Sequence, residues 1–158
     1  MRIASIRSMD ISNGPGIGIA LFTQGCPIRC FNCFNSELWD YDGGREWNSK
    51  EDTETIIELL RPIYIKRITI LGGEPFIDRN IEPLTNLVTK IREVYGKSKL
   101  IWMYSGQMFE NLYPKYASII SKIDKLIDGP YIDELKDYRL QWCGSTNQRV
   151  LDIEDLLK

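Results

Sequence analysis

Short apolar runs alternate with longer amphipathic stretches along this chain. Residues 17–23, 67–71 and 100–104 are rich in β-branched, aliphatic and aromatic side chains, as is typical of buried strands, and 124–128 is a shorter run of the same kind. From residue 81 to residue 91 the apolar side chains recur every three or four positions, which predicts a helix with one face against a sheet. The pattern therefore predicts strands and helices in alternation.

Local signals indicate where the helices begin and end. Ser49, with Asp52 three residues later, is expected to cap a helix that stops before Pro62. Asn80 is expected to cap the next helix, which Gly96 ends. The remaining predicted elements are a helical stretch over 108–120, interrupted at Pro114, and a short strand with a helical turn within 149–158.

Alternating strands and helices favour parallel pairing, because each crossover returns the chain to the same edge of the sheet. We therefore expect one α/β domain over residues 1–158, with a mostly parallel sheet and flanking helices. Each predicted strand ends at a glycine turn, and the carboxyl ends of parallel strands form the edge where ligands bind. The glycines of these turns are Gly25, Gly72, Gly106 and Gly129.

Composition narrows the classes of partner. A net charge of −2 and an isoelectric point near 5.3 give no basic footprint for nucleic acid or anionic lipid. No apolar run approaches the ~20 residues of a spanning helix, and the first ten residues are too polar for a signal peptide. We expect a cytoplasmic protein that binds neither nucleic acid nor membrane.

The segment "QGCPIRCFNCFN" contains three of the four cysteines, at Cys26, Cys30 and Cys33. The chain has no histidine, which excludes Ser-His-Asp and Cys-His catalysis and any mixed Cys/His zinc site. Three thiolates on a four-iron, four-sulfur cluster leave one iron without a protein ligand, and an open coordination position is where reactions occur. The three cysteines therefore predict a catalytic cluster.

Two other interpretations of the cysteines belong to different functional classes. With Cys143 as a fourth ligand, the same residues would form a four-cysteine zinc site in a non-catalytic interaction module, although Cys143 stands alone and most lone cysteines are packing residues. A simple electron carrier is less compatible, because carriers normally complete cluster ligation with protein residues. The tryptophans are assigned to the core or to interfaces.

The motifs resemble those of a known superfamily. "CPIRCFNC" matches the Cys-x3-Cys-x2-Cys signature of radical S-adenosylmethionine enzymes, and "GGEP" after the next strand resembles their motif for the methionine amino group. "NGPG", "CFNSELWD", "DGPYIDELKD" and "GSTNQRVLD" narrow the resemblance to the activating proteins of anaerobic (class III) ribonucleoside-triphosphate reductases. The similarity extends from about Asn13 to Asp152.

The resemblance implies a partial (β/α) barrel of the radical SAM type, with five or six strand–helix units by analogy. It also implies a [4Fe-4S] cluster on Cys26, Cys30 and Cys33, with S-adenosylmethionine on the fourth iron. In the family, reduced flavodoxin or ferredoxin supplies an electron, and the 5′-deoxyadenosyl radical takes a hydrogen atom from a glycine of the large reductase subunit. Activation of another glycyl-radical enzyme, such as pyruvate formate-lyase, is the near alternative.

The resemblance further suggests cofactor-binding residues. Asn32, Cys33 and Phe34 lie where the family backbone contacts adenine. Gly72 and Gly73 would let the backbone approach the ligand, and Glu74 would accept from its ammonium group. At the ends of the third and fourth strands, Ser105 and Asp128 are candidates for the ribose or the methionine carboxylate, or are turn formers only.

Two residues depart from the pattern of these activating proteins. A basic residue is common where this chain has Gly18, and glycine or an aromatic residue is usual where it has Asn32. Both departures leave cluster ligation intact. They bear on how the loop packs over the cofactor and on the surface beside the N-terminal strand.

Overall fold

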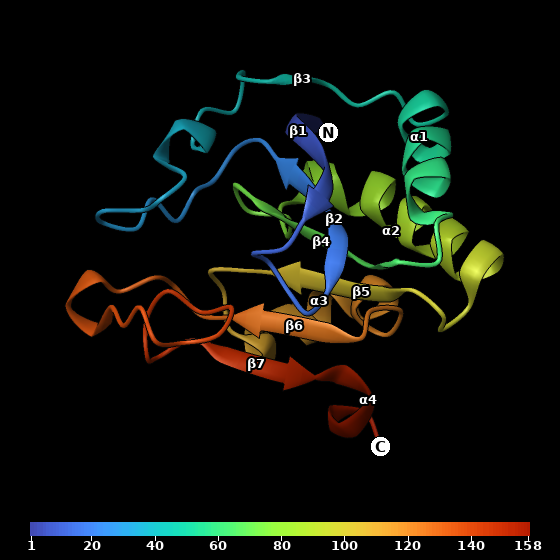
Figure 1. The fold of residues 1–158 in the computed structure, drawn as a ribbon. Helices are drawn as coiled ribbons and strands as arrows, with labels where there is room; N and C mark the ends of the chain where they lie inside the picture. The colour runs from blue at the N-terminus through green and yellow to red at the C-terminus, as the bar shows by residue number, and fades with distance from the viewer.

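Seven strands form one mixed sheet in the computed structural model, which describes residues 1–158 (Figure 1). Their order across the sheet is β3-β1-β2-β4-β5-β6-β7. The strands are β1 (Arg2–Asp10), β2 (Ile17–Thr23), β3 (Arg45–Glu46), β4 (Ile65–Gly72), β5 (Leu100–Tyr104), β6 (Lys125–Asp128) and β7 (Arg149–Asp152).

The centre of the sheet is parallel and its edges are antiparallel. β2, β4, β5 and β6 run in the same direction, whereas β1 and β7 run antiparallel to β2 and β6. The four predicted strands and the short C-terminal strand are confirmed, with β4 longer than predicted. β1 and β3 were missed. The expectation of five or six strand–helix units is wrong, because residues 24–50 and 129–148 form long loops with only brief regular structure.

Three helices connect the parallel strands, and a short fourth helix follows β7. The α-helices are α1 (Glu51–Leu60), α2 (Asp78–Tyr95), α3 (Phe109–Ile120) and α4 (Ile153–Leu156), and two 3-10 turns, η1 (Ser36–Leu38) and η2 (Asp133–Leu135), lie in the long loops. The predicted interruption of α3 is confirmed, since Tyr116, two residues after Pro114, has non-helical backbone angles. None of the helices combines the length and apolar character needed to cross a membrane.

The starts of two helices differ from the sequence prediction. Ser49 does not cap α1, whose N-cap residue is Lys50. In the turn before the helix, the Asn48 side-chain oxygen accepts from the N–H groups of Lys50 and Glu51, and Asp52 accepts from the Asn48 N–H at 2.7 Å. α2 begins at Asp78, so Asn80 lies inside the helix and is not its cap. Its buried amide instead donates to the Glu74 carbonyl oxygen at 3.2 Å.

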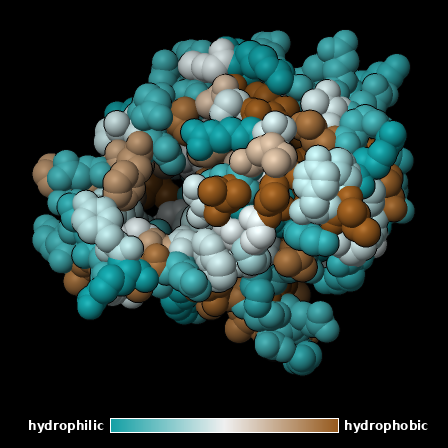
Figure 2. All heavy atoms as spheres, in the orientation of Figure 1, coloured by the Kyte–Doolittle hydropathy of each residue, from teal (hydrophilic) through white to brown (hydrophobic).

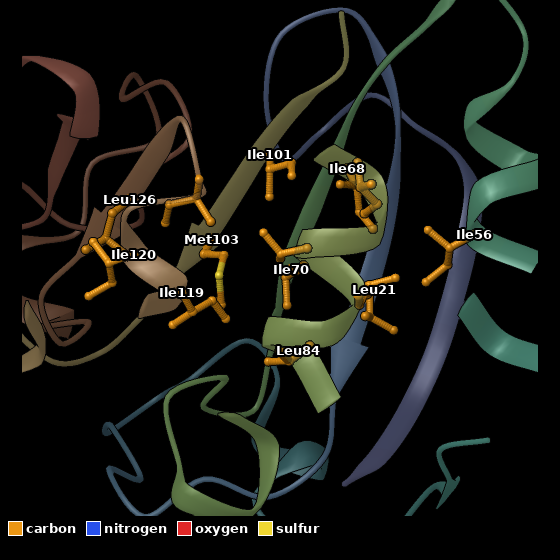
Figure 3. Packing of buried hydrophobic residues seen from close by; sticks show 14 of the residues in the cluster. Leu21, Ile56, Ile68, Ile70, Leu84, Ile101, Met103, Ile119, Ile120 and Leu126 are labelled. Carbon is orange, nitrogen blue, oxygen red and sulfur yellow. The ribbon is translucent and has the colours of Figure 1, made fainter. Parts of the chain in front are cut away.

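The two faces of the sheet are covered differently. On one face, Leu21, Ile70 and Met103 pack against side chains of α1, α2 and α3 in the main core (Figure 3). Alternate residues of the same strands point to the opposite face. There Ala20, Phe22 and Leu71 form a smaller cluster with Leu38, and Tyr104 packs beside it. This helix-free face is where the cavity lies.

Candidate functional site

A cavity of about 670 Å³ extends from the carboxyl ends of β2, β4 and β5 over the helix-free face of the sheet. The loop after β2 and the loop after β6 lie at this end of the sheet, and the surface is hollowed between them (Figures 1 and 2). Cys26, Cys30 and Cys33 line the cavity together with Gly72, Gly73 and Glu74. The prediction that the cysteines and the glycine pair share one edge of the sheet is confirmed.

Strand register brings the two motifs together. Thr23 pairs with Gly72, so β2 and β4 end at the same level and their loops leave side by side. The Gly73 N–H donates to the Thr23 carbonyl oxygen at 2.9 Å, and the Glu74 N–H donates to the Gly25 carbonyl oxygen at 2.8 Å. A Cβ atom on Gly73 would lie 2.3 Å from the Gly25 oxygen. Glycine at position 73 is therefore required by contact between the two loops.

The thiol groups receive backbone hydrogen bonds from their own loop and from its neighbour. Burial raises the pKa of Cys26, and the N–H groups of Ile28 and Arg29 oppose that shift. Burial likewise raises the pKa of Cys30, opposed by the N–H of Tyr131. The Asn35 N–H lies 3.4 Å from the Cys33 sulfur. Hydrogen bonds of this kind stabilise thiolates and tune the potential of a bound cluster.

The cavity edge offers thiol groups as its candidate metal ligands. All four cysteines are free thiols. A structural zinc draws its ligands to about 2.3 Å from one centre, whereas a cubane takes one thiolate on each iron and spaces them apart. No group of three or more Cys, Asp or Glu side chains converges in a way that would hold one metal ion. Thiolates are the donors that an iron–sulfur cluster takes from a protein, so the chemistry of these side chains is compatible with a cluster.

Glu74 is a buried carboxylate at the edge of this site. Its side chain accepts hydrogen bonds from the Phe76 N–H at 2.9 Å, the Gly106 N–H at 2.9 Å and the Ser105 hydroxyl at 3.0 Å. Burial raises the pKa of Glu74 to about 7, despite these donors. Its negative charge in turn contributes to the raised pKa of Cys26 and Cys30. The carboxyl group therefore lies beside the cysteines, with both of its oxygens held by hydrogen bonds within the protein.

Comparisons with known proteins agree with this site. A family model described as a 4Fe-4S single cluster domain matches residues 12–151. The anaerobic ribonucleoside-triphosphate reductase-activating protein of Escherichia coli K12 is 36% identical to this chain, over 90% of this chain and 92% of the relative. The protein of the same name from Enterobacteria phage T4 is 33% identical, over 98% of this chain and 96% of the relative. The relative from Salmonella typhi is 35% identical, over 95% and 97%. The chain belongs to this family of activating proteins.

Most residues that the sequence suggested for this activating-protein site line the cavity. Phe34 and Ser105 do so together with the cysteines and the Gly72–Glu74 segment. Ser105 contacts Glu74 and receives the Gln107 N–H at 2.9 Å, so within the protein it supports the carboxylate and the following turn.

Two suggested residues have other surroundings. Asp128 is completely buried, accepts from the Phe109 N–H at 2.7 Å and forms an ion pair with Arg149. It is not among the residues that line the cavity. Asn32 lies outside the main cavity, and its amide donates to Asp133 at 3.0 Å. Its φ of 55° falls in the left-handed region, which asparagine tolerates better than most residues, so this departure preserves the turn that glycine would make.

The other departure, Gly18, is explained by a buried arginine. Gly18 pairs with Arg67 of β4, and a Cβ atom on residue 18 would lie 2.5 Å from the Arg67 side chain. The Arg67 guanidinium donates to Asp10 at 2.8 Å and to the carbonyl oxygens of Gly14 at 3.1 Å and Pro15 at 3.2 Å. It therefore fixes the turn between β1 and β2.

The cavity wall also includes side chains to which the sequence assigned no role in the radical site. Trp39 and Trp142, assigned to the core or to interfaces, both reach its wall, and Trp142 packs edge-on against Trp102. Cys143 also lies on the wall, as does Arg7 of the unpredicted strand β1. No linear motif marks Arg7 or Trp142, because the topology of the sheet and the loop after β6 bring them to the site.

Proposed function

We propose that this protein activates an anaerobic ribonucleoside-triphosphate reductase by cleaving S-adenosylmethionine reductively and generating a glycyl radical on the large reductase subunit. Three free thiols and a buried carboxylate on one cavity edge, in a chain of this family, support the proposal most directly. We assign residues 1–158 to one radical SAM domain, whose open sheet and helix-free face suit a partial (β/α) barrel. A cytoplasmic setting suits four free cysteines.

Cys26, Cys30 and Cys33 would hold a [4Fe-4S] cluster and leave one iron for S-adenosylmethionine. When bound, the cluster would supply one electron to S-adenosylmethionine; cleavage of its carbon–sulfur bond would release methionine and a 5′-deoxyadenosyl radical able to take a hydrogen atom from the partner's glycine. A reduced flavodoxin or ferredoxin is the proposed source of that electron.

The proposed role of the residues of this chain is to bind and orient the cofactor and to shield it from water. Glu74 would accept from the ammonium group of the cofactor, and the Ser105 hydroxyl and the Gly106 N–H hold the carboxylate in place. Gly72 and Gly73 let the backbone come close to the ligand. The apolar wall of Phe22 and Leu71 excludes water from the part of the cavity that remains for the partner's glycine segment.

The test is anaerobic mixing of the reconstituted protein with the large reductase subunit, reductant and S-adenosylmethionine. We expect a glycyl EPR doublet on the subunit together with 5′-deoxyadenosine. Cys30→Ser should abolish both signals, whereas Cys143→Ser is the matched control and should retain them. An EPR signal of the reduced cluster that S-adenosylmethionine leaves unchanged would refute the proposal. A doublet on pyruvate formate-lyase alone would move the function to that partner.

A further inference from the structure

The outer edge of β1 is unpaired along most of its length. β3 pairs only with Arg2 and Ile3, and every other strand partner of β1 lies on the β2 side. No loop donates to or accepts from the main chain between Ser5 and Met9. Free N–H and C=O groups of an edge strand are a template for another extended chain.

Arg7 stands in the middle of this free stretch and turns toward the cavity. Its guanidinium lies 4.5 Å from the centre of the Phe22 ring and lines the cavity wall. It makes no ion pair and no hydrogen bond within the protein. Charged side chains often protect an edge strand by pointing outward, but this one lies over the sheet face. An unpaired guanidinium in this position favours a carboxylate as its ligand, because it can donate two parallel hydrogen bonds to the two carboxylate oxygens.

The surface around the edge is suited to contact with a partner. Met9 is 58% exposed and Ile11 is 74% exposed, and both follow Arg7 along the rim. Ser12 and Asn13 continue from this rim into the cavity wall. A strand that added to β1 would therefore pass beside the cavity that contains the cysteines.

We infer that the free edge of β1, from Ser5 to Met9, binds an extended segment of the reductase's large subunit by strand addition, with a carboxylate of that segment on Arg7. A side chain directly opposite Arg7 on the added strand lies on the same face, within reach of the guanidinium. The inference rests on the proposed function, because the occupant is the protein that carries the glycine.

A second copy of this chain is a poorer occupant. Arg7 is the central residue of the free stretch, so two copies related by a two-fold axis there would place Arg7 opposite Arg7. Like charges directly opposite each other destabilise a strand pair. The charge thus favours an acidic partner segment over self-association.

Affinity for the purified large subunit tests the role of Arg7. Since a hydrogen bond to a charged group contributes about 1.5 kcal/mol or more, Arg7→Ala should raise the Kd about tenfold, with Arg7→Lys in between. Arg61→Ala, at an exposed arginine beside α1, is the matched control and should leave the Kd unchanged. An Arg7→Ala variant that binds like the control, with an unchanged thermal melt, would overturn the inference.

Hydrogen exchange tests strand addition itself. On complex formation, amides between Ser5 and Met9 should become protected; exchange that stays the same there would overturn the inference. Protection that appears without the subunit, together with a dimer in sedimentation, would assign the edge to a second copy instead. If S-adenosylmethionine does not change the EPR signal of the wild-type cluster, the proposed function is refuted, whatever the binding data show. If the EPR signal changes as expected but Arg7→Ala binds the large subunit like the wild type, only the docking inference is refuted.

Discussion

Replacing Arg67 by methionine tests the buried ion pair that holds the turn between β1 and β2. The guanidinium lies 2.8 Å from the Asp10 carboxylate, with side-chain exposures of 0% and 2%. Arg67 also donates to the Thr69 hydroxyl at 2.8 Å, which itself donates to the Asn13 carbonyl oxygen at 2.7 Å. Methionine fills much of the same volume but carries no charge and no donor.

The expected loss follows from what the substitution leaves behind. Without Arg67, the Asp10 carboxylate keeps only the main-chain N–H and the side-chain amide of Asn13, at 3.1 and 2.8 Å. Removing one partner of a buried pair costs about 3–5 kcal/mol, because an uncompensated charge stays buried. Against a typical unfolding free energy of about 5–15 kcal/mol, that is a large fraction.

The sign of the pH dependence provides a second check. Burial pushes the pKa of Asp10 upward, but hydrogen bonds from Arg67 and Asn13 outweigh it and hold the pKa below its ordinary value of 3.8. In Arg67→Met the burial effect dominates, and the pKa of Asp10 should lie above the ordinary value. As the pH falls, protonation of Asp10 removes the uncompensated buried charge in the variant. The difference in unfolding free energy between wild type and Arg67→Met should therefore shrink from pH 7 toward pH 4.

Urea unfolding followed by tryptophan fluorescence measures both effects. Arg67→Met should lower the unfolding free energy at pH 7 by about 3 kcal/mol or more. The double variant Arg67→Met/Asp10→Asn is the control, and it should lose less than the single variant because no charge remains buried. A loss below about 1 kcal/mol for Arg67→Met, or a double variant less stable than the single one, would refute the reasoning.

Three further predictions concern the site. The pKa of Glu74 is about 7 in the folded protein against an ordinary 4.5, so between these pH values the folded state binds one proton more than the unfolded state. The unfolding free energy of the cluster-free protein should therefore fall by roughly 3 kcal/mol from pH 4.5 to pH 8. In urea titrations Glu74→Gln should remove this pH dependence, and a pH dependence that persists in the variant would contradict the prediction. Gly73→Ala should separate the two loops and lower the iron and sulfide content after reconstitution. Gly106→Ala is the control, because its Cβ meets only the flexible Ile28 side chain, and it should take up iron and sulfide normally. Equal iron and sulfide content in the two variants would contradict the contact argument. Cys143→Ser should keep full iron and acid-labile sulfide content, and loss of metal in this variant would restore the zinc interpretation.

The elements that sequence predicted well are those whose environment is uniform along their length. β2 is buried at six of its seven positions, so its residues form a continuous apolar run that needs no knowledge of neighbouring strands. β1 gives no such signal, because one edge is open, Arg7 and Ser8 are exposed, and irregularities in its pairing with β2 break the alternation. β3 is only two residues long. Edge strands were missed because their pattern depends on what lies beside them.

The candidate site divides in the same way. Cys26, Cys30 and Cys33 lie within one loop, so their linear spacing carries the information, and the Gly73 contact follows once β2 and β4 are adjacent. The ion pair of Arg67 with Asp10 joins residues 57 positions apart, and Arg7 reaches the cavity only because β1 lies next to β2. Neither contact has a local sequence signature.

Gly18 shows why a departure from a family pattern has to be interpreted in three dimensions. In sequence, glycine at a position that is commonly basic suggests a missing charge. In the structure, Arg67 of the adjacent strand fills the space beside Gly18 and supplies a guanidinium there. A side chain at position 18 would collide with Arg67, so an arginine at 18 requires a smaller residue at 67. The substitution Gly18→Arg alone should therefore destabilise the protein, and Gly18→Arg with Arg67→Ala should recover part of that loss in the same urea assay, because the charge beside Asp10 is restored from the other strand.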